Sequence, residues 1–152
     1  MIRMADKTDL ERLTELFVEL HSYHVGIMPE TFLMPERDWF SWRISEILSD
    51  VGQKVLVYDD GGIEAYAVVR IIDVDSEEKP RRKICFIDQF AVAERRRRHG
   101  IGTELFEAVK AFGRKKGCDS VQLGVSAGNA AARGFYEKMG LRPRTVQMED
   151  KL

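Results

Sequence analysis

The 152-residue chain contains little cysteine, histidine or proline, with two, three and four of each. Cys85 and Cys118 form no paired motif, so they indicate neither a disulfide framework nor a thiolate metal site. No apolar run approaches the roughly 18 residues that a membrane-spanning helix needs. The first residues also lack the apolar core of a signal peptide. We therefore expect a protein of the reducing cytoplasm with no membrane partner.

The composition is that of a globular protein, with 44% hydrophobic and 32% charged residues. This balance excludes a disordered chain. A chain of this length can bury one hydrophobic core, so we expect a single domain over residues 1–152.

The formal net charge of −1 hides an uneven distribution of charge. Residues 1–78 hold 7 basic and 17 acidic side chains, whereas residues 79–98 hold 8 basic and 2 acidic ones. A general nucleic-acid binder would carry a broader basic surface. The short positive patch indicates a small polyanionic ligand and no nucleic-acid partner, although residues 79–83 could equally be a solvated loop.

Hydrophobic periodicity and turn residues predict the element order β-α-α-β-β-β-α-β-α-β. The expected strands cover residues 2–4, 54–58, 63–74, 83–92, 120–125 and 141–148. The expected helices begin at the capping box of Thr8 and Glu11, at Pro35, at Gly100 and at Asn129. We expect residues 21–35, between the first two helices, to be irregular. Hairpins followed by a β-α-β unit predict an α/β domain with a mixed sheet and helices on both faces.

A basic, glycine-containing turn at residues 95–103 separates the strand at 83–92 from the helix that follows. The first amides of a helix lack intrahelical partners and lie at the positive end of its dipole. Gly100 and Gly102 let the backbone approach an anion, and arginine adds charge-assisted hydrogen bonds. The turn therefore predicts a phosphate-binding site.

Two common phosphate motifs do not fit this turn. The chain has no G-x-x-x-x-G-K-[ST] run, which a P-loop requires. A dinucleotide fingerprint needs a third small residue after Gly100 and Gly102 and an acid at the end of the next strand, and both are missing.

Two longer motifs do fit. Residues 97–102, Arg-Arg-His-Gly-Ile-Gly, match [QR]-x-x-G-x-[GA], and residues 129–141 match N-x(6)-Y-[EK]-K-x-G-[FL]. With these motifs and this element order, the chain resembles the GNAT superfamily of N-acetyltransferases over essentially its whole length. It departs from the family pattern at Arg98, where glycine is usual, and at Glu94, where proline is common. Only one strand, at residues 141–148, is available after the last helix, where the family often has a hairpin.

The resemblance implies acetyl-CoA as cosubstrate. The strand residues Phe90, Ala91 and Val92 would pair with the pantetheine arm, and a backbone amide there would polarise the thioester carbonyl. This strand and the one at 120–125 would splay apart to admit the arm. Asn129 would hydrogen-bond the pantetheine or cap the last helix. The pyrophosphate would be held by residues of the turn, namely Arg97, Arg98, His99, Gly100, Ile101, Gly102 and Thr103.

The resemblance also implies direct attack of an amine on the thioester in a ternary complex. Tyr136 would donate a proton to the departing thiolate; the alternative is an ordinary helix tyrosine. Asp88 would act as the general base, directly or through water, because an alkylamine must lose a proton before it attacks. The alternative for Asp88 is a solvated strand acid.

In this family the segment between the first two helices walls the acceptor site, which here implies His21, Tyr23, His24 and Met28. The two histidines lack a third metal ligand, so we expect no metal. Residues 6–50 hold 10 acids and 4 bases, which favours a small cationic amine as acceptor.

Other hypotheses remain open at this point. The same fold could be a catalytically idle module for acyl-CoA binding or protein interaction, and the arginine run could still bind nucleic acid. A short last strand leaves a sheet edge to cover, so we also expect a homodimer. The sequence leaves open whether a final strand comes from a partner chain.

Overall fold

The computed structural model describes residues 1–152 as one five-stranded mixed sheet in the order β1-β2-β3-β4-β5. Its neighbours pair antiparallel except for β4 and β5, which run parallel. This confirms the predicted α/β class. The strands are β1 (Ile2–Met4), β2 (Gln53–Asp59), β3 (Ile63–Ser76), β4 (Lys79–Val92) and β5 (Ser120–Leu123).

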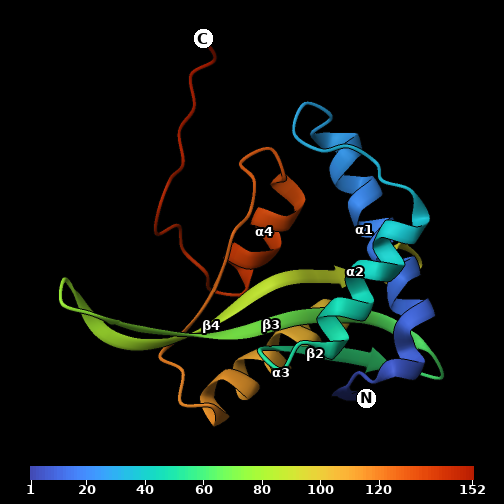
Figure 1. The fold of residues 1–152 in the computed structure, drawn as a ribbon, viewed down its shortest axis with the longest axis horizontal. Helices are drawn as coiled ribbons and strands as arrows, with labels where there is room; N and C mark the ends of the chain where they lie inside the picture. Colours follow the sequence, from blue (N-terminus) through green and yellow to red (C-terminus); the bar gives the residue numbers. More distant parts are fainter.

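Helices cover both faces of the sheet (Figure 1). Alternate residues of β3 divide between two cores: Tyr66 and Val68 pack with α1 and α2, whereas Ala67 and Val69 pack with α3. Such alternation follows from the period-2 geometry of a strand. The helices are α1 (Leu10–Ile27), α2 (Arg37–Ser49), α3 (Ile101–Lys115) and α4 (Ala130–Lys138), with 3-10 turns η1 (Lys7–Asp9) and η2 (Glu94–Arg96). None of the helices is long and apolar enough to cross a membrane.

Strand β4 changes its pairing along its length. The register with β3 shifts so that Val68 faces Gln89 and Val69 faces Ile87, which leaves Asp88 as the extra residue of a β-bulge. On its other side β4 pairs with β5 only from Ile84 to Ile87. The last five residues of β4, 88–92, therefore have no β5 partner.

The first helix differs from its prediction at both ends. The capping box is formed by Asp6 and Asp9, not by Thr8 and Glu11. Asp6 accepts from the Thr8 amide at 2.8 Å and Asp9 accepts from the Asp6 amide at 2.9 Å. The helix also continues to Ile27. The prediction that residues 21–35 are irregular is therefore wrong for residues 21–27, since packing against α2 overrides the weak helix propensities there.

The predicted last strand at residues 141–148 is also wrong. Residues 142–152 are all exposed, contain no regular structure and make no hydrogen bond. Pro143 lacks an amide hydrogen, and no strand of the same chain lies beside the segment to pair with it. Strand β5 likewise ends at Leu123, two residues before its predicted end.

Candidate functional site

The turn between β4 and α3 presents a row of unpaired amides. None of the six consecutive N–H groups from Arg98 to Thr103 makes a hydrogen bond within the protein, and the next one, at Glu104, bonds the Gly100 carbonyl at 3.0 Å. Gly100 is the N-cap of α3, with φ 80° and no capping side chain. A 15-residue helix thus points an uncapped N-terminus at this turn, which suits an anion.

Arg98 has an unusual backbone conformation, with φ 64° in the left-handed region. It is the sole non-glycine residue with positive φ. A side chain at such a position costs roughly 1–2 kcal/mol, because its Cβ crowds the following carbonyl. The structure therefore explains why glycine is usual here and shows that Arg98 is held under strain.

Gly102 lies where α3, α4 and β4 meet. A Cβ at this position would lie 3.3 Å from the Phe135 ring and 3.5 Å from Cγ2 of Val92. The absence of a side chain therefore lets α4 lie close to the start of α3. The second glycine of the turn therefore sets the packing of the site.

The four arginines before Gly100 divide into two pairs. Arg95 and Arg96 lie in ion pairs with acids of the protein, Glu64 and Asp60. Arg97 and Arg98 form no ion pair, and the guanidinium carbon of Arg97 lies 5.6 Å from the centre of the Tyr23 ring. The side chains of Arg97 and Arg98 are therefore free to bind an anion.

The unpaired end of β4 exposes specific backbone groups. The Ala93 amide donates to the Glu64 carbonyl of β3 at 2.8 Å. Because alternate residues of an antiparallel strand direct their polar groups to opposite sides, the N–H and C=O of Phe90 and Val92 point away from β3. They face the side on which β5 has ended, so an extended ligand can pair with them.

Tyr136 lies beside this opening on the α3 and α4 face. Its ring centre is 6.1 Å from that of Phe90 and 5.4 Å from that of Phe135, and its hydroxyl makes no hydrogen bond in the protein. Burial raises the pKa of Tyr136 to about 12. The phenol therefore stays protonated at neutral pH and is able to donate a proton.

Asp88, the bulge residue, is engaged by Arg70 of β3. Arg70 Nε lies 2.9 and 3.1 Å from the two carboxylate oxygens, and its guanidinium packs over the Phe86 ring at 4.8 Å. Beside it the Tyr66 hydroxyl donates to Gln89 Oε1 at 2.7 Å, and burial raises the pKa of Tyr66. Each oxygen of the carboxylate keeps a lone pair free and the side chain is 26% exposed, so Asp88 is able to accept a proton while Arg70 stays in place.

Asn129 is the N-cap of α4 and is buried. Its Oδ1 accepts from the Ala132 amide at 3.2 Å, so the structure shows the capping interaction. Its side-chain nitrogen has no partner in the protein. The residue can therefore cap the helix and still donate one hydrogen bond to a ligand.

The four residues expected on the acceptor wall lie on or directly after the C-terminal half of α1. His21 Nε2 lies 2.7 Å from the Leu33 carbonyl, and His24 stacks on Phe32 with ring centres 5.5 Å apart. Burial and the neighbouring His21 lower the pKa of His24. No cluster of three or more His, Cys, Asp or Glu side chains is arranged to hold a metal ion.

The other two wall residues, Tyr23 and Met28, contact the turn and the loop before α4. Tyr23 lies under Arg97, and Met28 lies against Gly128, where a Cβ would be 3.7 Å from the Met28 side chain. The C-terminal end of α1 therefore contacts both segments that border the opening of β4.

Sequence reasoning missed three contacts of the site: Arg70 with Asp88, Phe135 with Gly102, and Glu64 with the arginines of η2. Glu64 is the most buried of these groups, with a side chain 7% exposed, and its Oε2 has no hydrogen-bond partner. No sequence pattern marks these residues, because each contact joins two different elements of the fold.

Comparison with known proteins finds a family model and solved structures that match this chain. The model of the acetyltransferase (GNAT) family matches residues 10–141. A mutant of the BH1408 protein from Bacillus halodurans is 30% identical, with a TM-score of 0.94 over 100% of this chain and 99% of that one. A sequence comparison with curated proteins found no match.

Two further solved structures share the fold at lower identity. A possible acetyltransferase from Clostridium difficile 630 is 21% identical, with a TM-score of 0.81 over 100% of this chain and 96% of that one. The aminoglycoside N-acetyltransferase AAC(6')-Iy, in complex with the bisubstrate analogue CoA-S-monomethyl-acetylneamine, is 21% identical, with a TM-score of 0.71 over 100% and 98%.

Proposed function

Because the chain belongs to the acetyltransferase (GNAT) family, we propose that it transfers the acetyl group of acetyl-CoA to a small cationic primary amine. The observation that carries this proposal is the continuity of two sets of free amides. The turn from Arg98 to Thr103 follows the unpaired end of β4 with only the short turn η2 between them. One extended ligand with a pyrophosphate at one end and amide groups along its arm can form hydrogen bonds with both sets of amides.

The turn residues would hold the pyrophosphate. Their backbone amides supply the hydrogen bonds, and the Arg97 and Arg98 side chains supply counter-charge. Gly100, the N-cap of α3, supports the fit, because a Cβ there would meet no atom within 4 Å and the backbone is open to an approaching anion. His99 belongs to the turn itself, since its Nδ1 lies 2.8 Å from the Arg97 carbonyl.

The open edge of β4 would orient the acetyl-bearing arm. The backbone groups of Phe90 and Val92 would pair with the amides of pantetheine as a neighbouring strand would. One of these two N–H groups would stabilise the negative charge that develops on the thioester oxygen during attack. Asn129 would add a hydrogen bond from its free side-chain nitrogen.

In the reaction the amine nitrogen forms a bond to the carbonyl carbon and the bond from that carbon to sulfur breaks. A cationic amine gives up two protons. Asp88 would receive the first, directly or through water, before the attack; the second leaves the nitrogen as the carbon–nitrogen bond forms, and it replaces the proton that Tyr136 gives to the thiolate. The sulfur leaves as a thiolate and would take a proton from Tyr136. Burial keeps this phenol neutral until the thiolate forms beside it.

Charge supports a cationic acceptor. Residues 6–50, which include the acceptor wall, hold 10 acids and 4 bases. A negative surface attracts a cationic amine and disfavours an anionic one. The fold neighbour AAC(6')-Iy, an aminoglycoside N-acetyltransferase, gives further support for an amine acceptor.

The test is free-thiol release from acetyl-CoA with a panel of polyamines, aminoglycosides, lysine-like amines and neutral amines. We expect thiol release that depends on the amine and is fastest with cationic ones. The Gly102→Glu variant should lose coenzyme A binding, because it places a bulky anion in the turn. The matched control is Gly134→Ala in α4, where a Cβ meets open space. Equal rates for cationic and neutral amines would contradict the proposal that the acceptor is cationic.

One observation favours a second candidate function, acyl-CoA binding without turnover. Asp88 already pairs with Arg70 through both carboxylate oxygens, which is the contact expected of an ordinary structural ion pair. Tight coenzyme A binding with no thiol release for any amine of the panel would establish this second function and exclude the first.

A further inference from the structure

Helix α1 contacts both ends of the 3-10 turn η2. At the first end, the Glu94 amide donates to Oε1 of Glu19 at 3.2 Å. At the other end, the guanidinium carbon of Arg97 lies 5.6 Å from the centre of the Tyr23 ring. Glu19 and Tyr23 are four residues apart and so lie on one face of the helix. This face of α1 therefore contacts, at two points, the segment that leads into the turn at residues 98–103.

The contact of Tyr23 with Arg97 differs from the contacts of the two preceding arginines. Arg95 and Arg96 pair with carboxylates, which neutralise their charge and accept from their N–H groups. An aromatic ring attracts a guanidinium through its face, without the opposite charge of a carboxylate. The Arg97 side chain forms no ion pair and donates no hydrogen bond within the protein. It therefore keeps its charge and its N–H groups available while the ring limits its movement.

The side chain of Arg97 is the part of this residue that needs an external contact. Its backbone carbonyl lies 2.8 Å from Nδ1 of His99, so contacts within the turn order the main chain. The residue itself is exposed. A long exposed side chain loses rotamer freedom when it binds an anion, and this loss weakens binding. Contact with the Tyr23 ring reduces the freedom that remains to be lost when a ligand arrives.

On the basis of the proposed function, we propose that Tyr23 is a positioning residue for the cosubstrate. Its ring holds the Arg97 guanidinium where the pyrophosphate of acetyl-CoA binds. Tyr23 touches neither substrate and acts through Arg97. It then belongs to the cosubstrate side of the site and not to the acceptor wall that the family resemblance implied.

The experiment measures the binding of coenzyme A, which carries the pyrophosphate but no acetyl group, by calorimetry. Tyr23→Leu and Tyr23→Met both remove the ring and should raise the Kd about two- to fivefold. Tyr23→Phe keeps the ring and should bind as the parent does. In acetyl transfer, the two ringless variants should raise the KM for acetyl-CoA and leave kcat and the KM for the amine unchanged.

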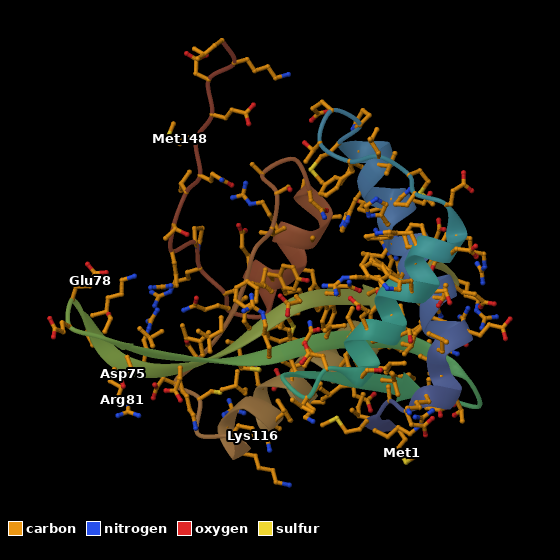
Figure 2. The ribbon with its side chains drawn as sticks, viewed as in Figure 1. Met1, Asp75, Glu78, Arg81, Lys116 and Met148 are labelled. Carbon is orange, nitrogen blue, oxygen red and sulfur yellow. The ribbon has the colours of Figure 1, made fainter.

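A double-mutant cycle tests whether Tyr23 acts through Arg97. Arg97→Leu should weaken coenzyme A binding, and Tyr23→Leu should weaken it no further in that background. Arg98→Ala removes the neighbouring cation, which lies over no aromatic ring, so its effect and that of Tyr23→Leu should add. The matched control is Arg81→Leu. It removes an arginine of the β3–β4 hairpin, far from α1 (Figure 2), and should leave the Kd unchanged.

The outcomes separate this role from the proposed function. Ringless variants that bind coenzyme A as tightly as the parent would overturn the role of Tyr23 and leave the proposed function standing. Additive effects of Tyr23→Leu and Arg97→Leu would do the same. A higher KM for the amine, with that for acetyl-CoA unchanged, would return Tyr23 to the acceptor wall. A parent that binds no coenzyme A would contradict both the proposed function and this role.

Discussion

Arg95 Nη2 lies 2.6 Å from Oε1 of Glu64, a buried carboxylate at the start of β3. Arg96 and Arg12 approach the same carboxylate at 3.7 Å. Glu64 also accepts the Ala93 amide through its backbone carbonyl. Glu64 therefore contacts both the main chain and the side chains of the segment that leads into the turn at residues 98–103.

The first prediction concerns this contact. Glu64→Gln keeps the shape but removes the charge that holds Arg95 and Arg96, so the turn should become more mobile. We expect the free energy of unfolding to fall by about 1–3 kcal/mol. The KM for acetyl-CoA should rise while kcat stays the same. S-acetyl-pantetheine, which lacks the pyrophosphate, should react at an unchanged rate.

The control is Asp75→Asn, whose partner Arg81 pairs with it on the exposed surface, away from Glu64. Exposed ion pairs contribute at most about 1 kcal/mol to the free energy of unfolding. Faster amide exchange at residues 98–103 in Glu64→Gln, measured without ligand, tests the turn independently of any enzyme activity. Unchanged exchange there would contradict the positioning role.

The second prediction concerns the strained Arg98. Arg98→Gly relieves the left-handed strain, so the free energy of unfolding should rise by up to about 1 kcal/mol. If the turn binds the pyrophosphate as proposed, the same change removes a cation beside it, and the Kd for coenzyme A should increase about three- to tenfold. Chemical denaturation and calorimetric binding measure the two effects. Arg98→Ala removes the charge but keeps the strain, and should show the weaker binding alone.

The third prediction concerns Tyr136. Tyr136→Phe removes only the proton that the thiolate would take, so kcat should fall at least about tenfold with little change in the KM for acetyl-CoA. Tyr58→Phe, on β2, is the control and should leave both constants unchanged. If kcat of the Tyr136 variant equals that of the parent, the residue is not the donor.

The fourth prediction concerns stability at alkaline pH. Burial raises the pKa of Tyr66, Tyr136 and Cys85, in the last case to about 11. The unfolded chain therefore releases these protons at lower pH than the folded chain does. The contribution of these three groups to the free energy of unfolding is complete below about pH 8.5. It is lost as the pH rises through their pKa values in the folded protein.

Urea denaturation at several pH values between 8 and 11 would measure this loss. Tyr66→Phe cannot ionise at this position and should show a shallower decline than the parent. A parent whose free energy of unfolding is constant over this range would contradict the prediction.

Periodicity and turn residues were enough to predict the sheet, the hairpin at residues 59–62 and the helix that begins after Gly100, because these depend on local sequence. The predicted last strand failed because strand formation needs a partner, which the chain alone does not supply for residues 141–148. The division of the arginines could not be predicted either, since Arg95 and Arg96 are fixed by Glu64 and Asp60 from distant positions.

The unpaired end of β4 has a consequence for mutational tolerance. If the cosubstrate is recognised there through the main chain, the recognition does not depend on which side chains occupy Phe90 and Val92. Every amino acid except proline supplies the same N–H group. Substitutions that respect the packing should therefore leave coenzyme A recognition intact, whereas a proline at Phe90 or Val92 should abolish it even where the domain still folds.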